Sequence, residues 1–188
     1  MTDILEQAIA DLQNRFQAQP CDICQDSGLM ISGDYIVEAA LLLRDTYGFN
    51  LLSDITATDY WPETTPRFHV IYTFTSVPEN ATDKPYIRLS LRVPLSENAP
   101  QVHTVEGIYP CANWFEREIW DMFGIRIEGL SDPRRLLMPR DWEGHPLRKD
   151  FPLGYEEPQF TFNFEEIAHR KPHPRKPVPR ASAGKEQS

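Results

Sequence analysis

The sequence predicts an α+β fold, in which helices pack on a largely antiparallel sheet and an extended C-terminal arm follows. Apolar residues recur at helical spacing in the first part of the chain, and strand-like alternation comes after them, as is typical of α+β domains. Beyond Pro152 this periodicity fades and prolines accumulate. We therefore expect one body over residues 1–152 and a proline-rich, partner-binding tail over residues 153–188.

Two helices are predicted before the sheet. Residues 3–16 form an amphipathic helix because their apolar side chains fall on one helical face. That face consists of Ile4, Leu5, Ala8, Ile9, Leu12 and Phe16. A short strand at residues 28–32 leads into a largely apolar helix over residues 33–48, with Asp34 near its start and Gly48 as its stop signal.

Three further segments are predicted strands, because they are rich in β-branched and aromatic residues. They cover residues 51–61, 67–76 and 86–95, and residues 77–85 make a hairpin connection. The last segment alternates, so one of its faces is expected to be buried and the other solvated. The buried set is Ile87, Leu89, Leu91 and Val93, and the solvated set is Arg88, Ser90 and Arg92.

A third helix is predicted over residues 112–124. Asn113 is the expected N-cap, Glu116 follows three residues later, and Gly124 lies just past the end. Its apolar residues occupy two faces, one with Phe115, Ile119 and Met122 and the other with Trp120 and Phe123. A helix that is apolar on two sides has something packed on both. One side faces its own sheet, and the other side is available to a partner.

Composition and charge exclude several classes of protein. The 188 residues carry a net charge of −9, but the last 20 residues carry +5 and the preceding part −14. An acidic body argues against nucleic acid as the main ligand, because duplex binding rests on neutralising phosphates. Three cysteines are too few for a disulfide scaffold and fit a reducing compartment. No secretory signal or membrane-spanning run is apparent, so we expect a cytoplasmic protein.

Candidate catalytic and metal sites are weak. Cys21 and Cys24 form a C-x-x-C pair, but it precedes a strand, and only Cys111 is left as a further thiol ligand. Glu118 and Asp121 share a helix face, as an acid/base pair would require, yet salt-bridged structural carboxylates are the stronger interpretation. Phosphate-binding glycine loops are absent. We therefore predict no metal and no bound cofactor in this chain.

The stretch from Glu116 to Asp150 is predicted to be a partner interface. It holds eight acids and seven bases interleaved with large apolar residues, a composition typical of interface centres. The alternative is a set of loops folded back and stapled by internal salt bridges. The expected interface residues are Glu116, Arg117, Glu118, Trp120, Asp121, Phe123, Arg134, Arg135, Trp142, Arg148, Lys149 and Asp150. The arm adds Phe160, Phe162 and Phe164, which alternate as if inserted into a partner surface.

Two blocks resemble one family. They are Glu-Arg-Glu-Ile-Trp-Asp-Met-Phe-Gly-Ile at residues 116–125, and Leu-Leu-Met-Pro at residues 136–139 running into Asp-Trp-Glu-Gly-His-Pro-Leu-Arg-Lys-Asp-Phe-Pro at residues 141–152. Together they resemble the C subunit of NADH-quinone oxidoreductase, which is the 30-kilodalton subunit family of respiratory complex I. The family loop Gly-His-Pro-Asp-Leu-Arg-Arg differs in this sequence, because Leu130 replaces the histidine and the proline moves to Pro133.

The resemblance implies a structural subunit without a cofactor, in the peripheral arm of a proton-translocating complex. It implies docking on the quinone-module large subunit (the D subunit), at the cytoplasmic side of the bacterial plasma membrane, with membrane contact only through the complex. The assembly would pass electrons from NADH through FMN and iron–sulfur clusters to quinone. A related alternative is the equivalent subunit of a membrane-bound hydrogenase or a ferredoxin-fed complex. Two alternatives of other classes are a free-standing enzyme using Glu118 and Asp121, and a basic tail that binds anionic membranes or nucleic acid.

Overall fold

The computed structural model describes residues 2–23, 26–78 and 86–152. Residues through Lys149 form one compact unit, which contains all of the described helices and strands. The sheet carries five strands in the order β1-β2-β5-β4-β3, and only the β2–β5 pair is parallel. The predicted α+β class with a largely antiparallel sheet is confirmed. The predicted arm, residues 153–188, lies outside the described residues.

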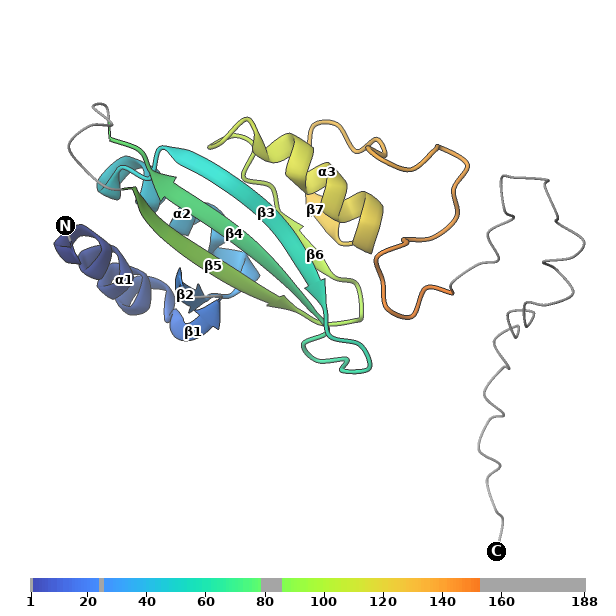
Figure 1. Cartoon of the computed structure of the whole chain (residues 1–188), viewed down its shortest axis with the longest axis horizontal. Coiled ribbons are helices and arrows are strands. Elements are labelled where there is room, and N and C mark those ends of the chain that lie inside the picture. Colours follow the sequence, from blue (N-terminus) through green and yellow to red (C-terminus); the bar gives the residue numbers. More distant parts are fainter. Residues whose placement is uncertain (1, 24–25, 79–85, 153–188) are drawn as a thin grey trace, which may run out of the picture. The chain divides into compact units, whose positions relative to one another are not determined.

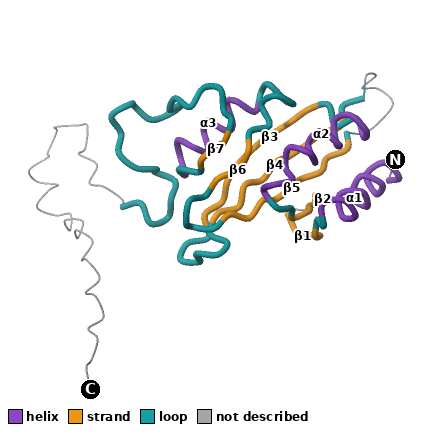
Figure 2. The backbone as a smooth tube through the Cα atoms, turned by 180° about the vertical axis from the view of Figure 1, so that it is seen from behind, coloured by secondary structure: helices purple, strands orange, loops and turns teal. Residues whose placement is uncertain are grey.

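The first helix, α1 (Thr2–Phe16), buries Ala8, Leu12 and Phe16 of its predicted apolar face. The second, α2 (Ile36–Tyr47), follows a single 3₁₀ turn, η1 (Gly33–Tyr35), so the helix predicted from residue 33 begins with a tighter first turn. Gly48 ends α2 in the left-handed conformation, as predicted. Helix α2 lies behind the sheet in Figure 1 and in front of it in Figure 2.

The three long strands are β3 (Leu51–Asp59), β4 (Phe68–Ser76) and β5 (Ile87–Leu95). All three lie within the segments that the sequence predicts as strands. Their inward side chains, together with α2, make a single core that includes Ile55, Tyr72, Phe74, Leu89, Leu91 and Val93. Ser90 corrects the expected solvated face of β5, because it is only 2% exposed. Since β5 is an inner strand, its neighbours shelter this face, and the Ser90 hydroxyl lies 3.3 Å from that of Thr73 on β4.

Four short strands complete the unit. The first two, β1 (Gln19–Ile23) and β2 (Asp26–Met30), form an antiparallel hairpin at the β5 side of the sheet. The other two, β6 (Gln101–His103) and β7 (Arg126–Glu128), form a separate two-stranded parallel sheet. Helix α3 (Ala112–Phe123) connects β6 to β7 and lies beside β3 (Figure 1). This arrangement places both ends of α3 next to the long loop that follows β7.

Candidate partner interface

The C-terminal end of α3 is capped by a remote segment of the chain. A helix leaves its last carbonyl groups without intrahelical partners. In this protein the His145 ring nitrogen lies 3.0 Å from the carbonyl oxygen of Asp121. The backbone amide of Leu147 donates to the carbonyl oxygen of Met122 at 3.1 Å. The Arg148 guanidinium donates to the carbonyl oxygen of Phe123. Residues 145–148 are therefore fixed on the helix end by these hydrogen bonds.

Gly124 is required at this junction for two reasons. Its φ of +70° is left-handed, and an added Cβ would lie 2.7 Å from Nη2 of Arg148 and closer still to the His145 ring. Gly48 has the same φ but open space around it. We expect Gly48→Ala to cost about 1 kcal/mol of unfolding free energy from the backbone alone. Gly124→Ala should cost about 1–3 kcal/mol more, because it also disrupts these caps.

Urea denaturation of the two alanine variants measures this difference directly. Both substitutions change the same residue type at the same backbone conformation, so the backbone cost cancels between them. Equal costs at the two positions would contradict the close docking of residues 145–148 on the end of α3.

Asp121 organises the segment that follows β7. Its side chain is fully buried and accepts hydrogen bonds from the backbone amides of residues 136, 137 and 138 at 2.8–3.0 Å. Arg135 adds an ion pair to Asp121 at 2.6 Å. Burial alone raises the pKa of the Asp121 carboxyl, but the amides and the Arg135 guanidinium outweigh it and hold that pKa below its ordinary value. Asp121 is thus a buried anion that determines the path of the loop.

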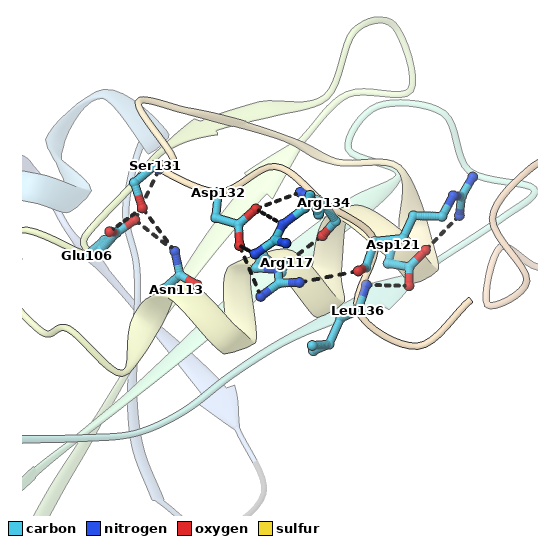
Figure 3. A network of polar contacts seen from close by, with 9 residues as sticks. Glu106, Asn113, Arg117, Asp121, Ser131, Asp132, Arg134 and Leu136 are labelled. Carbon is cyan, nitrogen blue, oxygen red and sulfur yellow. Dashed lines mark hydrogen bonds and ion pairs between the residues drawn. The ribbon is translucent and has the colours of Figure 1, made fainter. Parts of the chain in front are cut away.

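Arg117 fixes the same loop one helical turn earlier. It is 8% exposed and donates to the carbonyl oxygens of Arg134 at 3.0 Å and Arg135 at 3.2 Å (Figure 3). Its guanidinium also lies 3.5 Å from the Asp132 carboxylate and 5.1 Å from the ring centroid of Trp114. Arg117 therefore ties the chain's own following segment to α3, and contact of a partner with the side that carries Trp120 and Phe123 stays a prediction.

Glu106 anchors the beginning of the loop. Its carboxylate accepts hydrogen bonds from the hydroxyl and the amide of Ser131, at 2.6 and 3.2 Å, and from the Asn113 side chain at 3.1 Å (Figure 3). These bonds lower the pKa of Glu106. The predicted N-cap is wrong, because α3 begins at Ala112 after Cys111 and the Asn113 side chain is used for Glu106 instead. Leu130, which replaces the family histidine, packs against the core.

Glu116, on α3, carries a fully buried carboxyl group. It lies 2.5 Å from the Thr104 hydroxyl and accepts the Val105 amide at 2.8 Å, so it does not form the capping box expected at the helix start. Burial raises the pKa of Glu116 to about 7, although these two hydrogen bonds oppose the rise. The Tyr72 hydroxyl, also buried, has no hydrogen-bond partner in the part of the chain described. The negative charge of Glu116 contributes to the raised pKa of Tyr72, after burial.

A buried ion pair ties the loop to the main sheet. Asp59 and Arg67, at facing ends of β3 and β4, are each 1% exposed and joined by two hydrogen bonds of 3.0 Å. Asp59 also accepts the backbone amides of Trp61 and Lys149, both at 2.9 Å. The end of the compact unit is therefore held by the same carboxylate that closes the β3–β4 hairpin.

The structure separates the predicted interface residues by exposure. Buried residues are Glu116, Arg117 and Asp121; partly buried ones are Trp120, Phe123, Arg135 and Arg148. Exposed ones are Glu118, Arg134, Trp142, Lys149 and Asp150, whereas Phe160, Phe162 and Phe164 lie outside the described residues. The alternative interpretation, in which internal contacts hold the loops, applies to Arg135, Arg148, Glu116 and Asp121. These side chains support the surface residues from inside the protein. For the exposed residues, contact with a partner stays a prediction.

Sequence reasoning missed four residues that support this site: Asp59, Arg67, Glu106 and Ser131. Each one bonds to a group many residues away, so local spacing carries no signal for it. Within residues 2–23, 26–78 and 86–152, no cluster of His, Cys, Asp and Glu is arranged to hold a metal ion. Cys21 and Cys111 form no disulfide within the described residues, and Cys24 lies outside them. In that same part of the chain no helix has the length and apolar character needed to cross a membrane.

Four large apolar side chains are exposed on α3 and the loop after β7: Trp114, Leu137, Trp142 and Leu147. Leu137 is 62% exposed and Trp114 59%. The loop that presents them is held in place by Asp121, Arg117 and the helix caps, so these side chains sit on a fixed backbone. Exposed apolar groups on a rigid support are typical of a protein–protein contact surface. We call these four exposed residues together the apolar interface patch.

Comparison with known proteins finds relatives and solved structures that this chain resembles. Curated relatives named as the C subunit of NADH-quinone oxidoreductase include one from Trichlorobacter lovleyi, 39% identical over 78% of this chain and 88% of its own length. Another, from Roseiflexus sp., is 42% identical over 78% of this chain and 82% of its own length. A solved structure of the trypsin-resistant fragment of Nqo5 is 30% identical, with a TM-score of 0.54, over 70% of this chain and 97% of that one.

A second solved structure, of the membrane-bound sulfane sulfur reductase, an archaeal respiratory membrane complex, has a TM-score of 0.65 at 19% identity and covers all of this chain and 98% of that one. At that identity the likeness establishes the fold alone. Residues 29–157 match the family described as "Respiratory-chain NADH dehydrogenase, 30 Kd subunit", which spans both motif blocks. The chain therefore belongs to the family of the 30-kilodalton subunit of respiratory-chain NADH dehydrogenase.

Proposed function

We propose that this chain is a structural subunit of a proton-translocating NADH-quinone oxidoreductase and docks on the quinone-module large subunit. The observation that carries this proposal is the apolar interface patch on a loop fixed by buried ion pairs. A free monomer gains nothing from holding Leu137 and Trp142 rigidly in water, whereas a partner that covers them gains the free energy of their burial. The kind of complex, a respiratory-chain NADH dehydrogenase, is inferred from the family to which the chain belongs.

The chain itself is proposed to hold no FMN, iron–sulfur cluster or zinc. The chemistry of electron transfer from NADH to quinone would then belong to other subunits, and this chain would act through position. Of the two residues that a free-standing carboxylate enzyme would use, Asp121 is fully buried and engaged with three backbone amides and Arg135, whereas Glu118 is exposed. Asp121 is not presented to a substrate, so Glu118 lacks the second group of an acid/base pair, which favours the structural role.

The arm is proposed to extend along the partner, with Phe160, Phe162 and Phe164 inserted at alternate positions. Three phenylalanines bury on the order of several hundred Å² of apolar surface, which offsets the cost of ordering the backbone. The basic residues that follow would contact an acidic surface of the complex. Cross-linking through Lys171 and Lys176 in the purified complex tests this, because the links should lead to the quinone-module large subunit rather than to this chain's own body.

Affinity purification of the tagged chain from native membranes tests docking. We expect the quinone-module large subunit and the flavin-containing NADH-binding subunits to co-purify with the wild-type chain. Leu137→Asp should lower the retained amount of the quinone-module large subunit about tenfold or more, because a buried leucine contributes about 1.5–3 kcal/mol. Leu51→Asp is the matched control, since Leu51 is an exposed leucine (45%) on β3, outside the apolar interface patch.

Two outcomes would contradict the proposal. One is equal retention of the quinone-module large subunit by both leucine variants, which would remove the patch from the interface. The other is co-purification with the large subunit of a hydrogenase in place of the NADH-binding subunits, which would favour the related complex. Both variants alter exposed positions, so their melting transitions should match that of the wild-type chain.

A further inference from the structure

A groove between α3 and the loop after β7 combines tryptophan and arginine side chains. We call it the arginine–tryptophan groove, with a volume of about 430 Å³. Its principal lining residues are Trp114, Arg117, Trp120, Arg134, Arg135 and Arg140. Trp and Arg are the residue types most enriched at the energetic centres of protein interfaces. The groove lies on the same rigid support as the apolar interface patch, and Trp114 belongs to both.

The floor of the groove is already ordered. Arg117 packs its guanidinium 5.1 Å from the ring centroid of Trp114, and Arg135 lies 5.6 Å from that of Trp120. Both arginines are held from behind, Arg117 by two backbone carbonyl oxygens and Arg135 by Asp121. A ligand that enters the groove therefore meets side chains whose positions are already determined, which lowers the entropy lost on binding.

The rim of the groove carries positive charge that the described residues do not neutralise. Among the described residues, only Asp121 and Asp132 are paired with the four lining arginines. Arg134 pairs with Asp132 but its side chain is 68% exposed. Arg140 is exposed and, in the part of the chain that the structure describes, makes no hydrogen bond or ion pair. The groove thus has two positive charges in excess, next to an exposed indole.

We propose that the arginine–tryptophan groove binds an acidic, extended segment of the partner subunit. Carboxylates of that segment would pair with Arg134 and Arg140, since guanidinium groups bind carboxylates through two parallel hydrogen bonds. An apolar side chain between these carboxylates would lie on Trp114, which is 59% exposed. This inference rests on the proposed function for the existence of the partner, and it adds the place and the chemistry of the contact.

The charge of the rest of the chain favours a short acidic segment over a polyanion. Residues 1–168 carry a net charge of −14, which repels a nucleic acid or an anionic lipid surface at long range. A protein segment with a few carboxylates binds through contacts of a few ångströms, where the local arginines dominate. The groove is therefore assigned to a peptide, and lipid is an outcome that the test detects.

Photo-cross-linking from the groove tests the occupant. Trp114→p-benzoylphenylalanine keeps an aromatic group at the site, and the tagged complex is purified from membranes, irradiated and analysed by mass spectrometry. We expect a cross-link to another subunit, at a peptide with at least two Asp or Glu within a few residues. A cross-link to lipid, to this chain's own acidic residues 156–166, or to a peptide without acids would overturn the inference. The absence of any cross-link would do the same.

Charge removal at the rim gives an independent measurement. The double variant Arg134→Gln with Arg140→Gln should lower retention of the partner about tenfold, and the loss should shrink at high salt. The matched control is Arg15→Gln with Arg126→Gln, because Arg15 is also exposed and ion-paired (58% exposed) and Arg126 is exposed. Equal retention by the two double variants would overturn the inference. It would leave the proposed function intact provided that the wild-type chain still retains the quinone-module large subunit.

Discussion

Replacing Asp59 by alanine is expected to lower the free energy of unfolding by about 3–5 kcal/mol, the largest effect of a single substitution proposed for this chain. The reason is burial: Asp59 and Arg67 are each 1% exposed, and the substitution leaves the arginine charged inside the protein. Arg67 would keep its ion pair with Glu97, at 2.6 Å, but the Glu97 side chain is 40% exposed. The backbone amides of Trp61 and Lys149 would also lose their acceptor.

Urea denaturation compares this variant with two others. Asp45→Ala removes an exposed ion pair with Arg44 and should change stability little. The double variant Asp59→Asn with Arg67→Met removes both charges together and should recover much of the lost stability, because Glu97, which then loses its ion pair with Arg67, has a side chain that is 40% exposed. If Asp59→Ala lowers the free energy of unfolding as little as Asp45→Ala does, the buried ion pair does not stabilise this end of the sheet.

The pKa of Asp59 adds a dependence on pH. Burial raises the pKa of this carboxyl, but Arg67 and the two backbone amides outweigh burial and hold it below its ordinary value of 3.8. A lowered pKa in the folded state stabilises the protein above the unfolded-state value, and this contribution is lost as pH falls through the folded-state value. Acid unfolding of the wild-type chain should therefore be steeper than that of the Asp59→Asn, Arg67→Met variant.

Periodicity predicts the long elements of this fold because each of them buries one continuous face. α1, α2 and the strands β3, β4 and β5 lie where apolar spacing places them. The strands β1, β6 and β7 were not predicted, since they have three to five residues each and contain Pro20, Gln101 and Arg126 rather than an alternating apolar pattern. Tertiary pairing decides their conformation, and local propensity carries little weight there.

In the candidate site, too, the sequence predicts features that depend on local patterns and misses those that depend on contacts with remote residues. The sequence indicates that residues 116–150 are special, because charged and large apolar groups alternate there without forming a solvated face. It does not indicate which charges turn inward. Asp121 is buried because the backbone amides of residues 136–138 bind it. The side chains of those residues do not reveal that their backbone amides bind a carboxylate. Arg134 stays outside although it neighbours Arg135, whose guanidinium reaches Asp121.

The second large effect concerns Glu116 and is an effect of pH on stability. The side chain is fully buried, and burial raises its pKa from 4.5 to about 7, despite hydrogen bonds from Thr104 and Val105. Glu106, nearby and negatively charged, pushes the pKa in the same direction as burial. A carboxyl whose pKa is raised on folding stabilises the protein below the unfolded-state value and loses that contribution as pH rises through the folded-state value.

Glu116→Gln isolates this contribution. The glutamine amide is uncharged at every pH, and its oxygen and nitrogen match the Val105 amide and the Thr104 hydroxyl. Relative to the wild-type chain, the variant should therefore gain about 3 kcal/mol of unfolding free energy between pH about 4.5 and pH about 8. His69, whose pKa is lowered by burial and by Arg92, is common to both proteins, so its contribution cancels in the difference.

Glu118→Gln is the control for this measurement. Glu118 lies two residues away on the same helix and is exposed, so its replacement should leave the pH dependence of stability unchanged. Urea denaturation of the three proteins across this range gives the result directly. If the difference between Glu116→Gln and the wild-type chain stays constant with pH, Glu116 is ionised in its buried position throughout. The charge would then have to be stabilised by Thr104, Val105 and the end of β6, and Glu116 would serve as a permanent anion at the base of the interface, as Asp121 does.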